Sequence, residues 1–131
     1  MMLLDTNVVV AFLNGDKSVL KRIQTEINEI ALSTLVVAEL DYGAKISQKA
    51  KENLEKLYQF VDIAQVIPFD IECAKIFGTI KSKLRRLGKP TGEVDALIAA
   101  TAMVHGAVLV TASKKHFENI EGLKVEVWPI G

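Results

Sequence analysis

Three acidic side chains stand in surroundings that are otherwise apolar. Asp5 directly follows the short apolar run that opens the chain, and Asp95 begins a segment that is apolar on nearly every side. Glu39 is expected on the apolar face of a helix over residues 34–48, away from the polar residues of that helix. A carboxylate in such a place costs several kcal/mol of desolvation unless something pairs with it. The three positions are therefore candidates for chemistry.

Each acid also has a structural explanation. Asp5 or Thr6 would cap the helix that follows, since both types accept hydrogen bonds from free backbone amides. Asp95 would be stabilised by the dipole at the start of its helix, although no basic residue is near it in the sequence. Glu39 would meet a lysine or arginine that reaches in, or would touch water near a helix end. The sequence leaves both explanations open for each acid.

If the three acids met in one crevice, their charges would repel unless a divalent cation lay between them or one acid kept a proton. Carboxylate ligands without a His or Cys set favour Mg²⁺ or Mn²⁺ over zinc, and His105 and His116 are isolated in the sequence. Such an ion polarises a phosphoryl oxygen and lowers the pKa of a bound water, which then attacks phosphorus. The set predicts metal-dependent phosphodiester hydrolysis.

Short apolar segments alternate with helical patterns along the whole chain. Strands are expected at residues 2–4, 30–33, 64–67, 107–111 and 125–128. Helices are expected at residues 8–13, 34–48, 49–61, 71–87 and 93–104. Another is expected from Asp16, with an apolar stripe that reaches Ile30, and a short helical turn is expected after Ser113. This alternation is typical of an α/β fold with a parallel sheet and right-handed crossovers. With no repeat or linker, residues 1–131 are expected to form one domain, and ligands to collect past the strand ends.

Composition narrows the class of protein. Half of the 131 residues are hydrophobic, sixteen basic side chains balance sixteen acidic ones, and Cys73 is the only cysteine. An internal disulfide is excluded, and the charge balance gives no global attraction for nucleic acid. No apolar run reaches the ~18 residues of a membrane helix. We expect a soluble cytoplasmic protein with no membrane partner.

A local basic stretch precedes the Asp95 helix and is a candidate RNA contact. It consists of Lys81, Lys83, Arg85, Arg86 and Lys89, and Lys114 with Lys115 forms a smaller one. The alternative is a solvated charged face, which is the usual role of such a run. If it binds RNA, it does so through phosphates and weakens with salt.

Four motifs occur in order: LLDTN, LSTLVVAEL, GEVDALIAATA and VLVTASKKHFENIEGL. Together they resemble the PIN-domain family over essentially the whole chain, and in particular the VapC-like ribonuclease toxins of bacterial and archaeal toxin–antitoxin pairs. The resemblance implies a PIN-like domain with a five-stranded parallel sheet flanked by helices, a homodimer, an RNA substrate, and a VapB-like antitoxin whose tail covers the active site.

By that resemblance, Asp5, Glu39 and Asp95 correspond to the family's metal-binding acids, and Thr6 to a hydroxyl often found beside the first of them. The family often has Asp or Asn two residues after the threonine matched by Thr111, where this chain has Ser113. Serine is a poor Mg²⁺ ligand, so a complete second metal site is not expected. Glu93 either compensates in part or is a solvated acid at a helix start.

Two other functions remain open at this point. A degenerate PIN-like module would bind RNA or protein without cutting, and Ser113 in place of an acid is its only support. An aspartate-based phosphatase or a receiver domain also places an Asp after the first strand. The phosphatase pattern needs a second Asp where this chain has Asn7, and a receiver needs an acidic pair before Asp5 that is absent.

Overall fold

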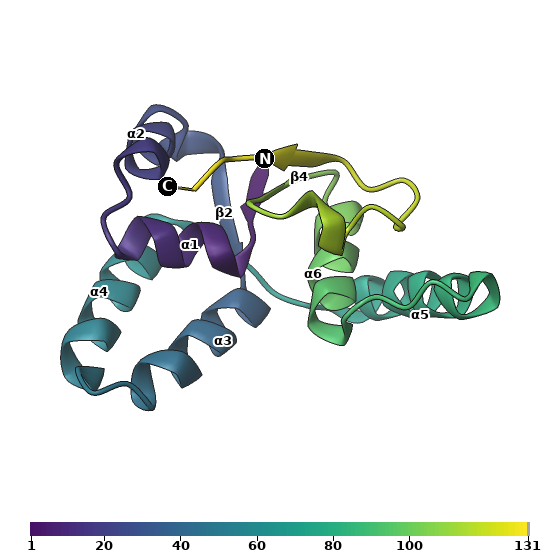
Figure 1. The fold of residues 1–131 in the computed structure, drawn as a ribbon, viewed down its shortest axis with the longest axis horizontal. Helices are drawn as coiled ribbons and strands as arrows, with labels where there is room; N and C mark the ends of the chain where they lie inside the picture. Colours follow the sequence, from purple (N-terminus) through teal and green to yellow (C-terminus); the bar gives the residue numbers. More distant parts are fainter. Residues whose placement is uncertain (131) are drawn as a thin grey trace.

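Five short parallel strands form the centre of the molecule. The computed structural model describes residues 1–130 and arranges the strands in the order β3-β2-β1-β4-β5 (Figure 1). The strands are β1 (Met2–Leu4), β2 (Ile30–Ser33), β3 (Gln65–Ile67), β4 (Val108–Thr111) and β5 (Val125–Val127). All neighbouring pairs are parallel, and Leu3 of β1 lies opposite both Ala31 and Leu109. The predicted five-stranded parallel α/β sheet is confirmed.

Within residues 1–130, six helices surround this sheet, and two 3₁₀ turns lie before β2 and after β4. The helices are α1 (Thr6–Leu13), α2 (Lys17–Thr25), α3 (Thr34–Lys45), α4 (Ala50–Ile63), α5 (Ile71–Leu87) and α6 (Glu93–Val104), and the turns are η1 (Ile27–Glu29) and η2 (Lys114–His116). Figure 1 shows α1 to α4 gathered on one side of the strands and α5 with α6 on the other. Helix α5 packs along α6, and its far end projects from the rest of the molecule.

Local signals set most helix ends. The Asp16 side chain accepts hydrogen bonds from the amides of Ser18 and Val19, and Gly88 ends α5 in the left-handed region at φ +65°. One expectation is wrong: the apolar stripe after Asp16 does not run as a helix to Ile30. Helix α2 ends at Thr25, because Ile30 is needed in β2, where it pairs with Met2 of β1.

The three central strands are fully buried where they cross the core, as at Leu4, Leu32 and Leu109. Helix α6 is buried on several sides, as its apolar sequence predicts. No helix within residues 1–130 has both the length and the hydropathy needed to cross a membrane.

The strand order fixes where a ligand site can form. From β1 the chain proceeds outward through β2 to β3, and it then returns to place β4 on the other side of β1. Open parallel sheets bind ligands at such a reversal, beside the carboxyl ends of the two strands that flank it. Here those two strands are β1 and β4, which end at Leu4 and Thr111.

Candidate active site

Asp5 lies at this reversal, directly after β1. Its side chain is only 4% exposed, and its backbone amide donates to the Val110 carbonyl of β4 at 2.8 Å. One carboxylate oxygen, Oδ1, accepts from the Thr6 amide at 2.9 Å, and the other accepts from the Thr111 hydroxyl at 2.7 Å. Helix capping therefore explains one oxygen of Asp5, while the second is held by a strand more than a hundred residues further along the chain.

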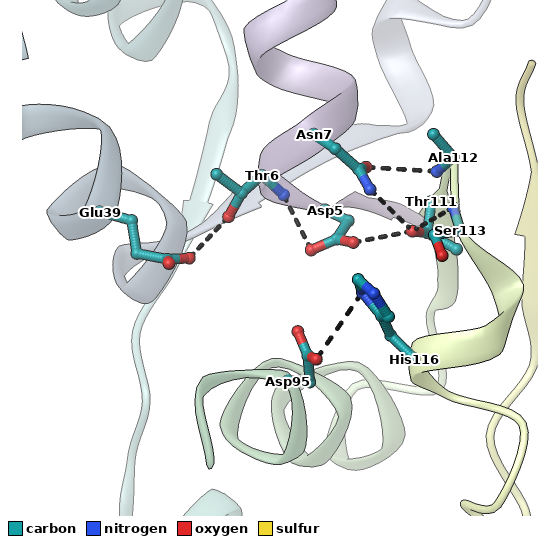
Figure 2. A network of polar contacts seen from close by, with 9 residues as sticks. All are labelled: Asp5, Thr6, Asn7, Glu39, Asp95, Thr111, Ala112, Ser113 and His116. Carbon is teal, nitrogen blue, oxygen red and sulfur yellow. Dashed lines mark hydrogen bonds and ion pairs between the residues drawn. The ribbon is translucent and has the colours of Figure 1, made fainter. Parts of the chain in front are cut away.

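Thr111 is the centre of the network that orients Asp5 (Figure 2). This buried hydroxyl donates to Asp5 and accepts from the Asn7 side-chain amide at 3.4 Å and from the Ser113 backbone amide at 3.1 Å. The Asn7 carbonyl oxygen accepts in turn from the Ala112 amide at 3.2 Å. The start of α1 and the end of β4 are thus tied together around one carboxylate.

Glu39 reaches the same place from α3, but not for the reason expected. Its Oε1 accepts from the Thr6 hydroxyl at 2.6 Å. The prediction that it lies on a buried apolar face is wrong: Glu39 is exposed, and its neighbours Tyr42 and Ile46 are 66% and 68% exposed. Only part of the apolar stripe of α3 is buried, as at Val36, and Glu39 lies instead beside α1, where Thr6 donates to it.

Asp95 faces Asp5 from the first turn of α6 (Figure 2). Its Oδ2 lies 3.8 Å from Nδ1 of His116 on η2, so the fold supplies the imidazole neighbour that the sequence around Asp95 lacks. Gly92 is packed against the same carboxylate, since a Cβ atom on this glycine would lie 3.1 Å from Asp95 Oδ2. His116 could not be linked to Asp95 from the sequence, because the two residues are far apart in the chain and His116 reaches the site from the segment after β4.

The three acids share one electrostatic environment. Burial raises the pKa of Asp95, and the carboxylates of Asp5 and Glu39 raise it further, while His116 lowers it. Asp5 and Glu39 form no ion pair within the part of the chain that the structure describes. The carboxylates of Asp5 and Glu39 therefore repel that of Asp95, and a bound cation would relieve this repulsion.

The donor chemistry of the site suits a hydrated magnesium or manganese ion. Within residues 1–130 no three metal-ligating side chains surround a common point, so a closed cage of protein ligands is not formed. Mg²⁺ does not need one, because it keeps several waters and is held by one or two carboxylates. Asp5 and Asp95 provide two oxygen donors that face each other, whereas zinc would need His or Cys ligands that are not grouped here.

The remaining predicted residues are placed as follows. Ser113 contributes its backbone amide to the Thr111 hydroxyl, and Glu93 is exposed at the start of α6. The five basic residues of α5 and its following loop do not share one surface. Lys81, Arg85 and Lys89 line a groove, whereas Lys83 pairs with Glu121. Arg86 is exposed in the last turn of α5 and does not line this groove.

Two members of the site were absent from the residues selected by sequence. Asn7 belongs to the LLDTN motif, and its position two residues after Asp5 was a usable signal, because an amide there can both donate and accept at the end of β4. His116 belongs to the last motif, directly before the buried Phe117. Only the fold reveals that the short η2 turn brings this imidazole to Asp95.

Comparison with known proteins gives full-length matches. Residues 2–123 match the PIN domain family. The chain is 34% identical over 127 residues to the tRNA(fMet)-specific endonuclease VapC of Shigella flexneri and 35% identical over 129 residues to Ribonuclease VapC2 of Rickettsia felis, each match covering 96% of both chains. A crystal structure of VapBC2 from Rickettsia felis bound to a DNA fragment from their promoter contains a chain that superposes with a TM-score of 0.92 at 33% identity, covering 97% of this chain and 98% of that one.

Proposed function

Because this chain belongs to the PIN-domain family, among its VapC ribonuclease toxins, we propose that Asp5, Asp95 and Glu39 form a magnesium- or manganese-dependent site that hydrolyses phosphodiester bonds in RNA. This membership removes the aspartate-phosphatase and receiver alternatives. The observation that carries the proposal is the placement of three acids, remote in sequence, around the carboxyl ends of β1 and β4 with a raised pKa at Asp95.

The chain's own residues have separable roles in this proposal. Asp5 and Asp95 hold the ion, and Glu39 completes the negative field that attracts it. When bound, the ion supplies polarisation of a phosphate oxygen and a water of lowered pKa. Thr111 and Asn7 fix the orientation of Asp5, so that its carboxylate does not have to reorganise during the reaction.

Thr6 links the two halves of the acidic group. Its backbone amide donates to Asp5 and its hydroxyl donates to Glu39, so one residue sets the separation of the two carboxylates. Ser113 takes no ligand role in the proposal, because a neutral hydroxyl is a weak partner for Mg²⁺. One fully held ion is therefore favoured over two.

RNA is the proposed substrate, and transfer RNA is the first class to test, because the Shigella flexneri relative is named as a tRNA endonuclease. The proposed partners are a VapB-like antitoxin whose tail covers the acidic site and a second copy of this chain in a homodimer. Support for the antitoxin comes from solved relatives, which are toxin–antitoxin complexes. The cytoplasm is the proposed location, and residues 1–131 are proposed to act as one nuclease domain.

The test is RNA cleavage by the purified chain. A mixed transfer RNA preparation is incubated with Mg²⁺, with Mn²⁺ and with excess EDTA, using wild-type protein and the Asp5→Asn variant. Cleavage that requires the metal and is lost in the variant supports the proposal. A matched Asp62→Asn variant, on the exposed side of α4, controls for loss of a surface carboxylate and is expected to cut normally. Undiminished cleavage by Asp5→Asn refutes the assignment.

A further inference from the structure

A groove at the end of α5 gathers three of the five basic side chains that precede Asp95. Lys81, Arg85 and Lys89 line it together with the loop residues Pro90 and Thr91, and its volume is about 580 Å³. No acidic residue lines it. None of the three basic side chains forms an ion pair with any residue from 1 to 130. We call these residues the basic groove.

Helix geometry explains why these three residues, and not all five, meet. Lys81 and Arg85 are four residues apart and so lie on one face of α5. Gly88, in the left-handed conformation, ends the helix and turns the chain so that the Lys89 amide donates back to the Leu84 carbonyl at 3.0 Å. Lys83 points elsewhere, toward its partner Glu121.

The loop that forms one wall of the basic groove also leads directly into the acidic site. Lys81 Nζ donates to the Thr91 carbonyl at 3.4 Å, and the next residue, Gly92, caps α6. Gly92 lies beside the Asp95 carboxylate, since a Cβ atom added to this glycine would be 3.1 Å from Asp95 Oδ2. Thr91, in the wall of the groove, and Asp95 are therefore close in the chain, with only the start of α6 between them.

We infer that the basic groove binds a backbone phosphate of the RNA strand at a position flanking the bond that is cut. The inference rests on the proposed function, because it takes RNA to be the occupant of the acidic site. Arg85 offers a planar, forked donor set that matches a phosphate, and the two lysines add point charges.

Charge balance is the reason that such a groove is needed. The chain has no net charge, and the acidic site itself repels a polyanion. Attraction for RNA must come from a local set of cations that no protein acid neutralises. The basic groove is such a set, and the short segment from Thr91 to Asp95 connects its wall to the acidic site. Phosphate contacts of this kind fix the register of the strand and read no sequence.

The experiment measures RNA binding rather than cleavage. The probe is a fluorescein-labelled single-stranded RNA of mixed sequence, about 20 nucleotides long, enough to span both sites. All proteins are the full chain carrying Asp5→Asn, and anisotropy gives Kd over a series of salt concentrations. The test variant is Arg85→Gln with Lys89→Gln, and the matched control is Lys51→Gln with Lys75→Gln, which removes two exposed lysines elsewhere.

Loss of two phosphate contacts lowers the slope of log Kd against log salt by roughly 1.4, at ~0.7 per contact for single strands. The control pair leaves the slope unchanged. Because Arg85 also lies in the last turn of α5, where a positive charge favours the helix, the thermal unfolding midpoint is measured for each protein. If the double variant does not fold, Lys89→Gln alone, beyond the helix end, is expected to lower the slope by about 0.7.

A slope equal to that of the control overturns the inference. It is also overturned if a poly-glutamate peptide binds as tightly as the RNA and loses affinity equally in the test variant, because the groove then serves an acidic peptide. The outcome is separable from the proposed function. If the test variant lowers the slope but the wild-type protein does not cut RNA, the groove inference stands and the nuclease assignment is refuted. If the wild-type protein cuts RNA and the test variant leaves the slope unchanged, only the groove inference is refuted.

Discussion

Replacing Thr111 with valine removes one buried hydroxyl and leaves the shape of the side chain almost unchanged. That hydroxyl donates to the Asp5 carboxylate at 2.7 Å and accepts from the Asn7 side chain and the Ser113 amide. Thr111 is fully buried and Asp5 nearly so, and water therefore cannot easily replace the lost donor. We expect the Thr111→Val variant to be destabilised and to cleave RNA more slowly.

The size of the effect follows from these three bonds. A hydrogen bond to a charged group contributes about 1.5–3 kcal/mol, and a neutral one about 0.5–1.5 kcal/mol, with the 3.4 Å bond from Asn7 at the weak end. The sum is about 2.5–5 kcal/mol of unfolding free energy. For a chain of 131 residues, at roughly 2.1 cal/mol/K of unfolding entropy per residue, this lowers the melting temperature by about 9–18 °C.

Urea and thermal unfolding of purified variants, without metal, measure this loss. Thr101→Val is the matched control, because Thr101 is equally buried but its hydroxyl donates to the Leu97 carbonyl within α6. It should cost at most about 1 kcal/mol. Thr111→Ser keeps the hydroxyl and should retain most of the cleavage rate. A Thr111→Val protein as stable as the Thr101→Val control would show that the network does not hold Asp5, and the reasoning would fail.

Three further predictions concern the acidic group. Burial and the neighbouring carboxylates raise the pKa of Asp95 in the folded protein. Folding therefore favours the protonated form of Asp95: this stabilisation is full below the unfolded pKa of 3.8 and is lost as the pH rises through the folded pKa. Asp95→Asn should therefore stabilise the metal-free protein at neutral pH, as urea unfolding in EDTA will show; equal stability of both proteins contradicts this. Glu39→Gln keeps the bond from Thr6 at an exposed site, so unfolding should change by less than ~0.5 kcal/mol. Its Mg²⁺-dependent cleavage should fall by about 10–100-fold, and an unaffected rate removes Glu39 from the mechanism. Gly92→Ala should push the Asp95 carboxylate aside and weaken Mg²⁺ about 10-fold in a calorimetric titration, with unchanged affinity as the contrary result.

Much of the fold was predictable because its signals are local. Short apolar runs between helical patterns gave the five strands, and residues such as Asp16 and Gly88 marked helix ends through their own backbone preferences. The exception was Ile30, which fits a helical stripe as well as a strand. Its pairing with Met2 decides the outcome, and that contact is remote in sequence.

The three acids of the candidate site could be selected from the sequence, but the contacts that position them could not, and Asn7 and His116 were missed. Glu39 was selected because it was expected to be buried, yet it is exposed and is placed by Thr6. Helical periodicity gives the faces of a helix, but it cannot say which face meets the protein. His116 could not be joined to Asp95 from spacing, because η2 and α6 meet only through the path of the chain after β4.

The basic stretch shows what periodicity could have resolved. Lys81 and Arg85 share a helix face, and Lys83 lies off that face, so the five charges could not all serve one ligand. What periodicity could not give is the return of Lys89 to the same groove, which depends on the left-handed turn at Gly88.

The central claim is that Asp5 and Asp95 hold a divalent ion between the ends of β1 and β4. The most direct measurement is a crystal of the full chain soaked in Mn²⁺, with anomalous scattering used to locate the metal. We expect a peak in contact with both carboxylates, and no peak at that place in crystals of Asp95→Asn. A fully soaked wild-type crystal with no peak there, or with the ion bound away from Asp5, would contradict the account.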